Sequence, residues 1–127
     1  MDDEEPVRAV VGASLQGMGH EVVLVGDGAQ AVEVYEKSKA LGRPFDAVIL
    51  DLTVKGGIGG REAISQLLQL DPGVRAIVMS GYSSDTVLMN PESHGFRGVL
   101  TKPFDSAELR EVLAQVMGDR SRTQPTP

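Results

Sequence analysis

One stretch of the chain decides the fold: residues 45–51, which read FDAVILD. The apolar run inside it is typical of a strand that is buried in a parallel sheet. The run ends at Asp51, so a carboxylate stands where this strand meets solvent. Ligands of parallel sheets bind beyond the carboxyl ends of the strands. Asp51 is therefore the first candidate for a functional residue.

Strand and helix patterns alternate along the rest of the chain. Apolar runs predict strands at 21–25, 46–50, 75–80 and 98–100, and helical spacing predicts helices at 6–18, 28–40, between Gly60 and Asp71, at 83–94 with a break at Asn90-Pro91, and at 105–117. This alternation predicts an α/β fold in which helices cover both faces of a parallel sheet. Residues 1–118 form one domain, and we expect the polar tail 119–127 to be disordered.

Composition excludes several classes of function. The net charge of −6 argues against a surface that binds nucleic acid. The chain lacks cysteine, and His20 and His94 stand apart, so neither a disulfide framework nor a histidine-rich metal site is expected. Without an apolar run of about 20 residues or a signal peptide, we expect a cytoplasmic domain that makes no membrane contact.

Polar residues stand at the ends of three predicted strands. Asp51, Ser80 and Lys102 lie at the carboxyl ends of the strands at 46–50, 75–80 and 98–100, so they should meet at one edge of the sheet. The chain also opens with four acids at 2–5. Carboxylates and a lysine are the parts of a magnesium-dependent phosphate site. The glycines at 56–60 lack the ending of a phosphate-binding loop, and we expect a flexible connection to the next helix.

One strand of the predicted sheet is missing. Asp2 and Asp3 look like residues that follow a strand, yet residues 1–5 are too few for both strand and loop. In a flavodoxin-like, doubly wound sheet of order 2-1-3-4-5, strand 1 lies in the middle, and its loss leaves two inner strands unpaired. Three solutions are open: a partner chain that donates a strand or swaps an element, as in a homodimer through strand exchange, a rearrangement in which the helices close over the gap, or a longer natural chain, which we favour. We expect added Val/Leu-rich residues before Met1 to raise the urea midpoint.

Four motifs in order resemble the receiver domain of two-component response regulators. They cover the chain from Asp2 to about Met117, and together they are far more specific than any one of them. The motifs are DDEEPVR at 2–8, DAVILDLT at 46–53, MSGY at 79–82 and TKPF at 101–104. The segments 56–60 and 95–104 also look like receivers that are fused to hybrid sensor histidine kinases.

The resemblance implies a Mg²⁺-dependent phosphoacceptor. Asp51 would receive the phosphoryl group from a sensor histidine kinase or a histidine phosphotransfer domain. Asp2, Asp3, Asp51 and the backbone carbonyl of Thr53 would hold Mg²⁺. Whether Asp2 and Asp3 are aimed correctly without a strand before them stays open.

The same resemblance assigns the other strand-end residues. Lys102 would contact the phosphoryl oxygens, Ser80 would hydrogen-bond the phosphoryl group, and the Lys102–Pro103 bond would be cis. The chain departs from the family at two positions. The family often has proline where this chain has Lys55, and it usually has an aromatic residue where this chain has Val99. Tyr82 stands where the family tunes dephosphorylation. No DNA-binding module follows in this chain, so we expect output through a partner.

Two other classes of function compete with this reading. A receiver fold can serve as a protein-interaction module that is never phosphorylated, and phosphorylation of Asp51 discriminates the two. A phosphatase-like hydrolase with an Asp nucleophile would typically carry a second Asp two residues later, where this chain has Thr53.

Overall fold

A three-stranded parallel sheet forms the centre of the molecule. A computed structural model describes residues 1–52, 54, 57–81 and 86–123 of the chain. Its strands are β1 (Val48–Asp51), β2 (Ala76–Ser80) and β3 (Gly98–Thr101), in the order β1-β2-β3. They correspond to the three predicted strands of the 46–50, 75–80 and 98–100 runs.

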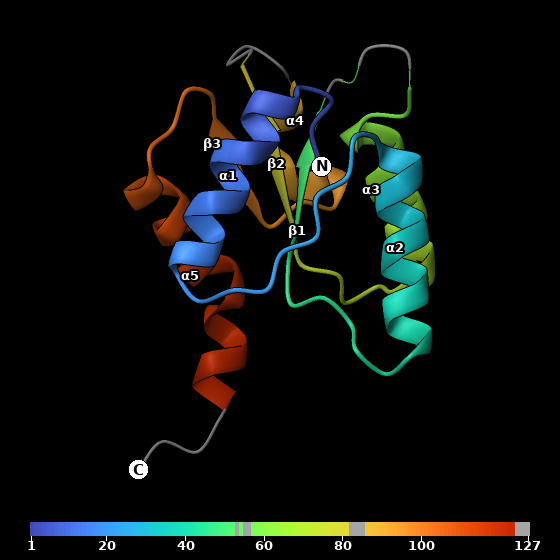
Figure 1. Cartoon of the computed structure of the whole chain (residues 1–127). Helices are drawn as coiled ribbons and strands as arrows, with labels where there is room; N and C mark the ends of the chain where they lie inside the picture. Colours follow the sequence, from blue (N-terminus) through green and yellow to red (C-terminus); the bar gives the residue numbers. More distant parts are fainter. Residues whose placement is uncertain (53, 55–56, 82–85, 124–127) are drawn as a thin grey trace.

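Helices cover both faces of this sheet. They are α1 (Glu5–Gly17), α2 (Gly28–Ala40), α3 (Gly60–Leu70), the short α4 (Thr86–Met89), a 3₁₀ turn (Pro91–His94) and α5 (Ser106–Thr123). Figure 1 shows α1 and α5 on one face, with α2 and α3 on the other. The predicted doubly wound α/β fold is therefore confirmed. No described helix is long and apolar enough to cross a membrane.

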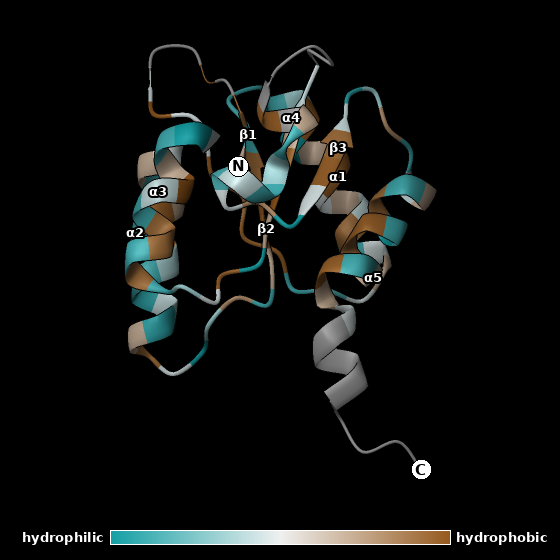
Figure 2. Ribbon diagram, turned by 180° about the vertical axis from the view of Figure 1, so that it is seen from behind, coloured by the Kyte–Doolittle hydropathy of each residue, from teal (hydrophilic) through white to brown (hydrophobic). Residues whose placement is uncertain are grey.

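The core consists of two apolar layers that the sheet separates. Along β2, Ala76 and Val78 pack into the layer under α2 and α3, whereas Ile77 and Met79 pack into the layer under α1 and α5. This is the alternation that a strand imposes when both of its faces are covered. Hydropathy colouring shows apolar residues on the helices and strands that make these layers (Figure 2).

The predicted strand at 21–25 does not form. The segment follows α1 and leads to α2 without strand structure, and the side chains of Val23 and Leu24 are 53% and 49% exposed. The reason is the missing neighbour, because a strand needs a ladder partner and β1 is too far across the gap. The prediction from the apolar run was thus wrong.

Met1 and Asp2 form one rung of the missing strand. The amino group of Met1 donates to the Ile49 carbonyl at 2.7 Å, and its carbonyl accepts from the Asp51 N–H at 3.0 Å. On the other side, the Asp2 N–H donates to the Val25 carbonyl at 3.2 Å. One extended residue pair therefore spans the distance between β1 and residues 21–25.

Beyond that rung the gap stays open. A cavity of about 830 Å³ lies between β1 and residues 21–25, and it is also lined by residues of α1, α2 and α5. We call this cavity the strand slot. The alternative in which helices close over the gap is not what the structure shows.

Two predicted helices differ in extent from the observed ones. Of the predicted helix at 83–94, the described residues 86–94 form α4 and the 3₁₀ turn, with the break at Asn90-Pro91 where it was expected. The last helix was predicted to end at Met117, but α5 continues to Thr123 because no proline stops it before Pro125. Residues 124–127 lie outside the described part of the chain, where the disordered tail stays a prediction.

Two glycines bring α3 against the end of β1. A Cβ at Gly59 would lie 2.6 Å from the Leu52 carbonyl oxygen, and one at Gly60 would lie 2.7 Å from that of Asp51. Both glycines are buried, and Glu62 accepts a hydrogen bond from the Gly59 N–H at 3.2 Å. The expected flexible connection is therefore, at these positions, a tightly packed junction beside Asp51.

We predict that Gly60→Ala destabilises the protein by about 1–3 kcal/mol, because backbone atoms must shift to admit the methyl group. Gly118→Ala is the matched control, since nothing lies within 4 Å of a Cβ there and α5 should gain about 0.5–1 kcal/mol. Urea denaturation measures both changes. Equal midpoints for the two variants would contradict the close approach of α3 to β1.

Candidate functional site

The carboxyl ends of the strands bring the predicted residues together. Asp51 ends β1, Ser80 ends β2, and Lys102 follows the last residue of β3. Ser80 lies opposite Thr101 in the ladder, and the Lys102 N–H donates to the Ser80 carbonyl at 2.8 Å. Asp51 and Ser80 are both buried. The expected meeting of three polar residues at one edge of the sheet is confirmed.

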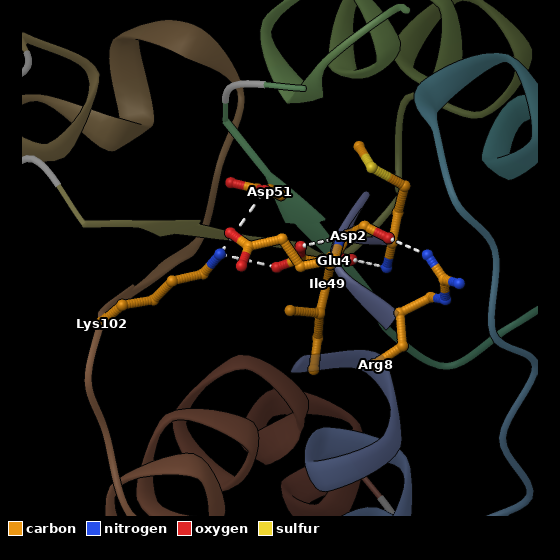
Figure 3. Close-up of polar contacts among 7 residues, drawn as sticks. Asp2, Glu4, Arg8, Ile49, Asp51 and Lys102 are labelled. Atoms are coloured by element: carbon orange, nitrogen blue, oxygen red, sulfur yellow. Dashed lines mark hydrogen bonds and ion pairs between the residues drawn. The ribbon is translucent and has the colours of Figure 1, made fainter. Parts of the chain in front are cut away.

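Lys102 lies between two buried carboxylates. Its Nζ is 2.6 Å from Oδ2 of Asp2 and 3.5 Å from Oδ2 of Asp51. Figure 3 shows the lysine reaching both acids from the side of β3. The Lys102–Pro103 bond is cis, as the resemblance implied. Asp2 is thereby aimed at the site although only one rung of its strand is present.

Three contacts hold Asp2 in this position. Met1 anchors the backbone to β1, the Glu4 N–H donates to Asp2 Oδ1 at 2.9 Å, and Arg8 donates to the Asp2 carbonyl at 2.7 Å. Sequence reasoning quoted Arg8 within the first motif but gave it no role. Its place one turn into α1, just after the acids, was the available signal.

The electrostatics of the site favour a positive ion. Burial acts to lower the pKa of Lys102, but the hydrogen bond to Asp2 and the charges of Asp51 and Asp2 outweigh it, so the pKa is raised. Lys102 stays protonated and offsets one carboxylate. Asp2, Asp3, Glu4 and Asp51 carry four formal negative charges, and Lys102 and Arg8 carry two positive ones, so two negative charges remain.

The donor set fits Mg²⁺. Carboxylate oxygens of Asp2, Asp3 and Glu4 lie within 4.8 Å of one another, and hard oxygen ligands are those that Mg²⁺ prefers. The predicted ligand set contained Asp2 and Asp3 but not Glu4, whose side chain is exposed. Thr53, the predicted carbonyl ligand, and Tyr82 lie outside the described residues.

Comparison with known proteins identifies the family. The family model for the response regulator receiver domain matches residues 1–114, so the chain belongs to this family. The receiver domain of a sensor histidine kinase from Pseudomonas aeruginosa superposes with a TM-score of 0.80 at 27% identity, covering 93% of each chain. That structure has a magnesium ion coordinated in its active site cleft.

Curated relatives include both short and long proteins. Sporulation initiation phosphotransferase F of Bacillus subtilis is 25% identical, over 92% of this chain and 90% of its own length. The sensor protein TorS of Escherichia coli is 31% identical over 95% of this chain, which spans only 13% of TorS. The chain is thus similar to nearly the whole of one relative and to a small part of another.

The amino group of Met1 makes stability depend on pH. Burial lowers its pKa from 8.0 to about 6, and the nearby charges of Asp2 and Asp51 only partly oppose this. Between these two pH values the unfolded chain binds a proton that the folded chain does not, so stability rises with pH. In EDTA, we predict a gain of about 2 kcal/mol from pH 6 to pH 8.

Urea denaturation at both pH values measures this gain. The control is the N-acetylated chain, which has no titratable amino group but keeps an N–H for the Ile49 carbonyl. The two chains differ only at this amino group, so every other pH-dependent contribution to stability cancels in the comparison. An equally steep rise in the acetylated chain would contradict the assignment to Met1.

Proposed function

We propose that this receiver domain accepts a phosphoryl group on Asp51 in a Mg²⁺-dependent reaction. The donor would be a phosphohistidine of a sensor histidine kinase or of a histidine phosphotransfer domain. Membership of the receiver family and the similarity to parts of sensor kinases support this donor class. We also propose that the domain acts in the cytoplasm, where such a kinase domain would meet it.

The single observation that carries the proposal is the placement of Lys102 between Asp2 and Asp51. A nucleophilic carboxylate, an ammonium within reach of it and an acidic cluster at one strand edge are what phosphoryl transfer requires. The reaction depends on positioning and charge neutralisation more than on covalent chemistry. All of these groups stand on strand ends or next to them, which limits their freedom.

The residues of the site divide this work. A carboxylate oxygen of Asp51 attacks phosphorus, so a P–O bond forms while the P–N bond to histidine breaks and its electron pair returns to the imidazole. Lys102 moves from Asp2 to the phosphoryl oxygens, and Ser80 hydrogen-bonds the same group. Asp2, Asp3, Asp51 and the Thr53 carbonyl would hold Mg²⁺. When bound, the ion supplies positive charge that offsets the phosphoryl oxygens.

The mass of the intact chain tests the proposal. Incubation with a small phosphodonor and Mg²⁺ should add one phosphoryl group to the natural chain and none to Asp51→Asn. EDTA should prevent the gain. Asp46→Asn is the matched control, because Asp46 is an exposed carboxylate two residues before the other end of β1.

Two outcomes would contradict the proposal. One is a natural chain whose mass does not change with donor and Mg²⁺, which favours the unphosphorylated interaction module. The other is an Asp51→Asn variant that is still labelled, which places the acceptor elsewhere.

Lys102 donates a hydrogen bond to a carboxylate oxygen of Asp2 that Mg²⁺ would need as a ligand. Oδ2 of Asp2 accepts from Lys102, while Oδ1 accepts from the Glu4 N–H. We therefore predict that Lys102→Met raises the affinity for Mg²⁺ by about tenfold or more, since a charged hydrogen bond no longer competes. The same variant should be phosphorylated more slowly, because the phosphoryl oxygens lose their ammonium partner.

Calorimetric titration with Mg²⁺ measures the affinity, separately from the phosphorylation rate. Lys37→Met is the control, since it removes the same charge from an exposed pair with Glu33 on α2. It should leave both quantities unchanged. An unaltered or weaker Mg²⁺ affinity in Lys102→Met would show that the lysine does not compete with the ion.

A further inference from the structure

Every hydrogen-bonding group of Asp2 has a partner. The N–H donates to the Val25 carbonyl at 3.2 Å, and the Asp2 carbonyl accepts from Nη1 of Arg8 at 2.7 Å. Of the two carboxylate oxygens, Oδ1 accepts from the Glu4 N–H and Oδ2 accepts from Lys102. Asp2 is only 1% exposed, so these bonds replace the water that a buried polar residue loses. The orientation of its carboxylate depends on which of these partners stay when an ion binds.

Two of the partners are cations, and they bond different parts of Asp2. Lys102 donates to Oδ2, so it would have to give up this oxygen when Mg²⁺ binds there. Arg8 donates to the backbone carbonyl, which is not one of the proposed ligands. Figure 3 shows the two side chains reaching Asp2 from different sides. Binding of the ion is therefore incompatible with one of these bonds and compatible with the other.

The carbonyl that Arg8 holds belongs to the peptide group between Asp2 and Asp3. Both acids are proposed ligands, so the plane of this peptide group sets the direction of both side chains. Arg8 lies in the first turn of α1 and is half-buried. Its guanidinium lies beside the turn at Gly26, where a Cβ would be 3.5 Å from Nη1. A charged donor at this distance makes a stronger bond than a neutral one, so the peptide group is tied to a helix.

We propose that Arg8 is a positioning residue of the metal site, which keeps Asp2 and Asp3 in the orientation that binds Mg²⁺. The inference rests on the proposed function, in which both acids are ligands. Groups that orient metal ligands through hydrogen bonds typically contribute about 10–100-fold to the affinity for the metal. Arg8 itself touches neither the ion nor the phosphoryl group in this role.

The sign of the effect separates positioning from charge. Arg8 is a positive charge beside the site, so its charge alone predicts that removing it strengthens the binding of a cation. Water and salt screen this repulsion, because the side chain is only half-buried. Loss of positioning predicts weaker binding instead. Arg8→Met and Lys102→Met each remove one positive charge from Asp2, yet they should change the Mg²⁺ affinity in opposite directions.

Calorimetric titration with Mg²⁺ tests the proposal. Arg8→Met keeps a side chain of similar length without the donor, and it should weaken binding by about tenfold. Arg8→Lys should recover most of this loss, because its ammonium can donate to the same carbonyl. Arg97→Met is the matched control, since Arg97 is an exposed arginine at the amino end of β3, away from the site. It should leave the affinity unchanged.

Hydrogen exchange in EDTA measures the positioning without the ion. The Glu4 N–H is bonded to Oδ1 of Asp2, so it reports whether this side chain keeps its place. In Arg8→Met the Glu4 amide should exchange at least about threefold faster than in the natural chain, because the turn opens more often. Arg97→Met should leave this rate unchanged, and NMR resolves the single amide.

Three results would overturn the proposal. The first is an affinity for Mg²⁺ in Arg8→Met that equals or exceeds that of the natural chain. The second is a loss in Arg8→Met that Arg8→Lys does not reduce, which would assign the loss to packing. The third is an unchanged exchange rate of the Glu4 amide in Arg8→Met. Each of these results can occur in a natural chain that binds Mg²⁺ and is phosphorylated, so this proposal and the proposed function fail separately.

Discussion

The parallel rung that Met1 and Asp2 make with Ile49, Asp51 and Val25 is the constraint on which the site depends. It ties the start of the chain to the end of β1, and so places the Asp2 carboxylate 2.6 Å from Lys102, which is 100 residues away in sequence. Arg8 and the Glu4 N–H then fix the orientation of Asp2. A single rung thus replaces the strand that would otherwise aim the acids.

The rung also explains how an incomplete sheet can support a complete strand edge. β1, β2 and β3 are paired with one another in register, so Asp51, Ser80 and Lys102 gain their positions from a ladder that does not involve the slot. Only Asp2 and its neighbours lie where the missing strand would be, and the single rung holds them there. The site therefore combines a rigid half on the sheet with a half that is held by a few hydrogen bonds.

The sequence was sufficient for features that local pattern determines and insufficient for those that need a distant partner. The helices over 28–40 and 60–70 and the placement of Asp51, Ser80 and Lys102 at strand ends followed from periodicity and topology. The strand at 21–25 was wrong because its partner is missing, which no property of its own residues reveals. The packing of Gly60 depends likewise on where the Asp51 carbonyl lies, and the role of Arg8 depends on where the Asp2 carbonyl lies.

The two ends of this chain are not equivalent for anyone who wishes to label or immobilise it. The Met1 nitrogen is bonded to the Ile49 carbonyl at the top of the strand slot, so any affinity tag or fluorophore joined there begins inside the sheet. Helix α5 ends at Thr123, far from the N-terminus and the strand edge (Figure 1). A reporter attached after α5 would leave the packing around Asp2 as it is.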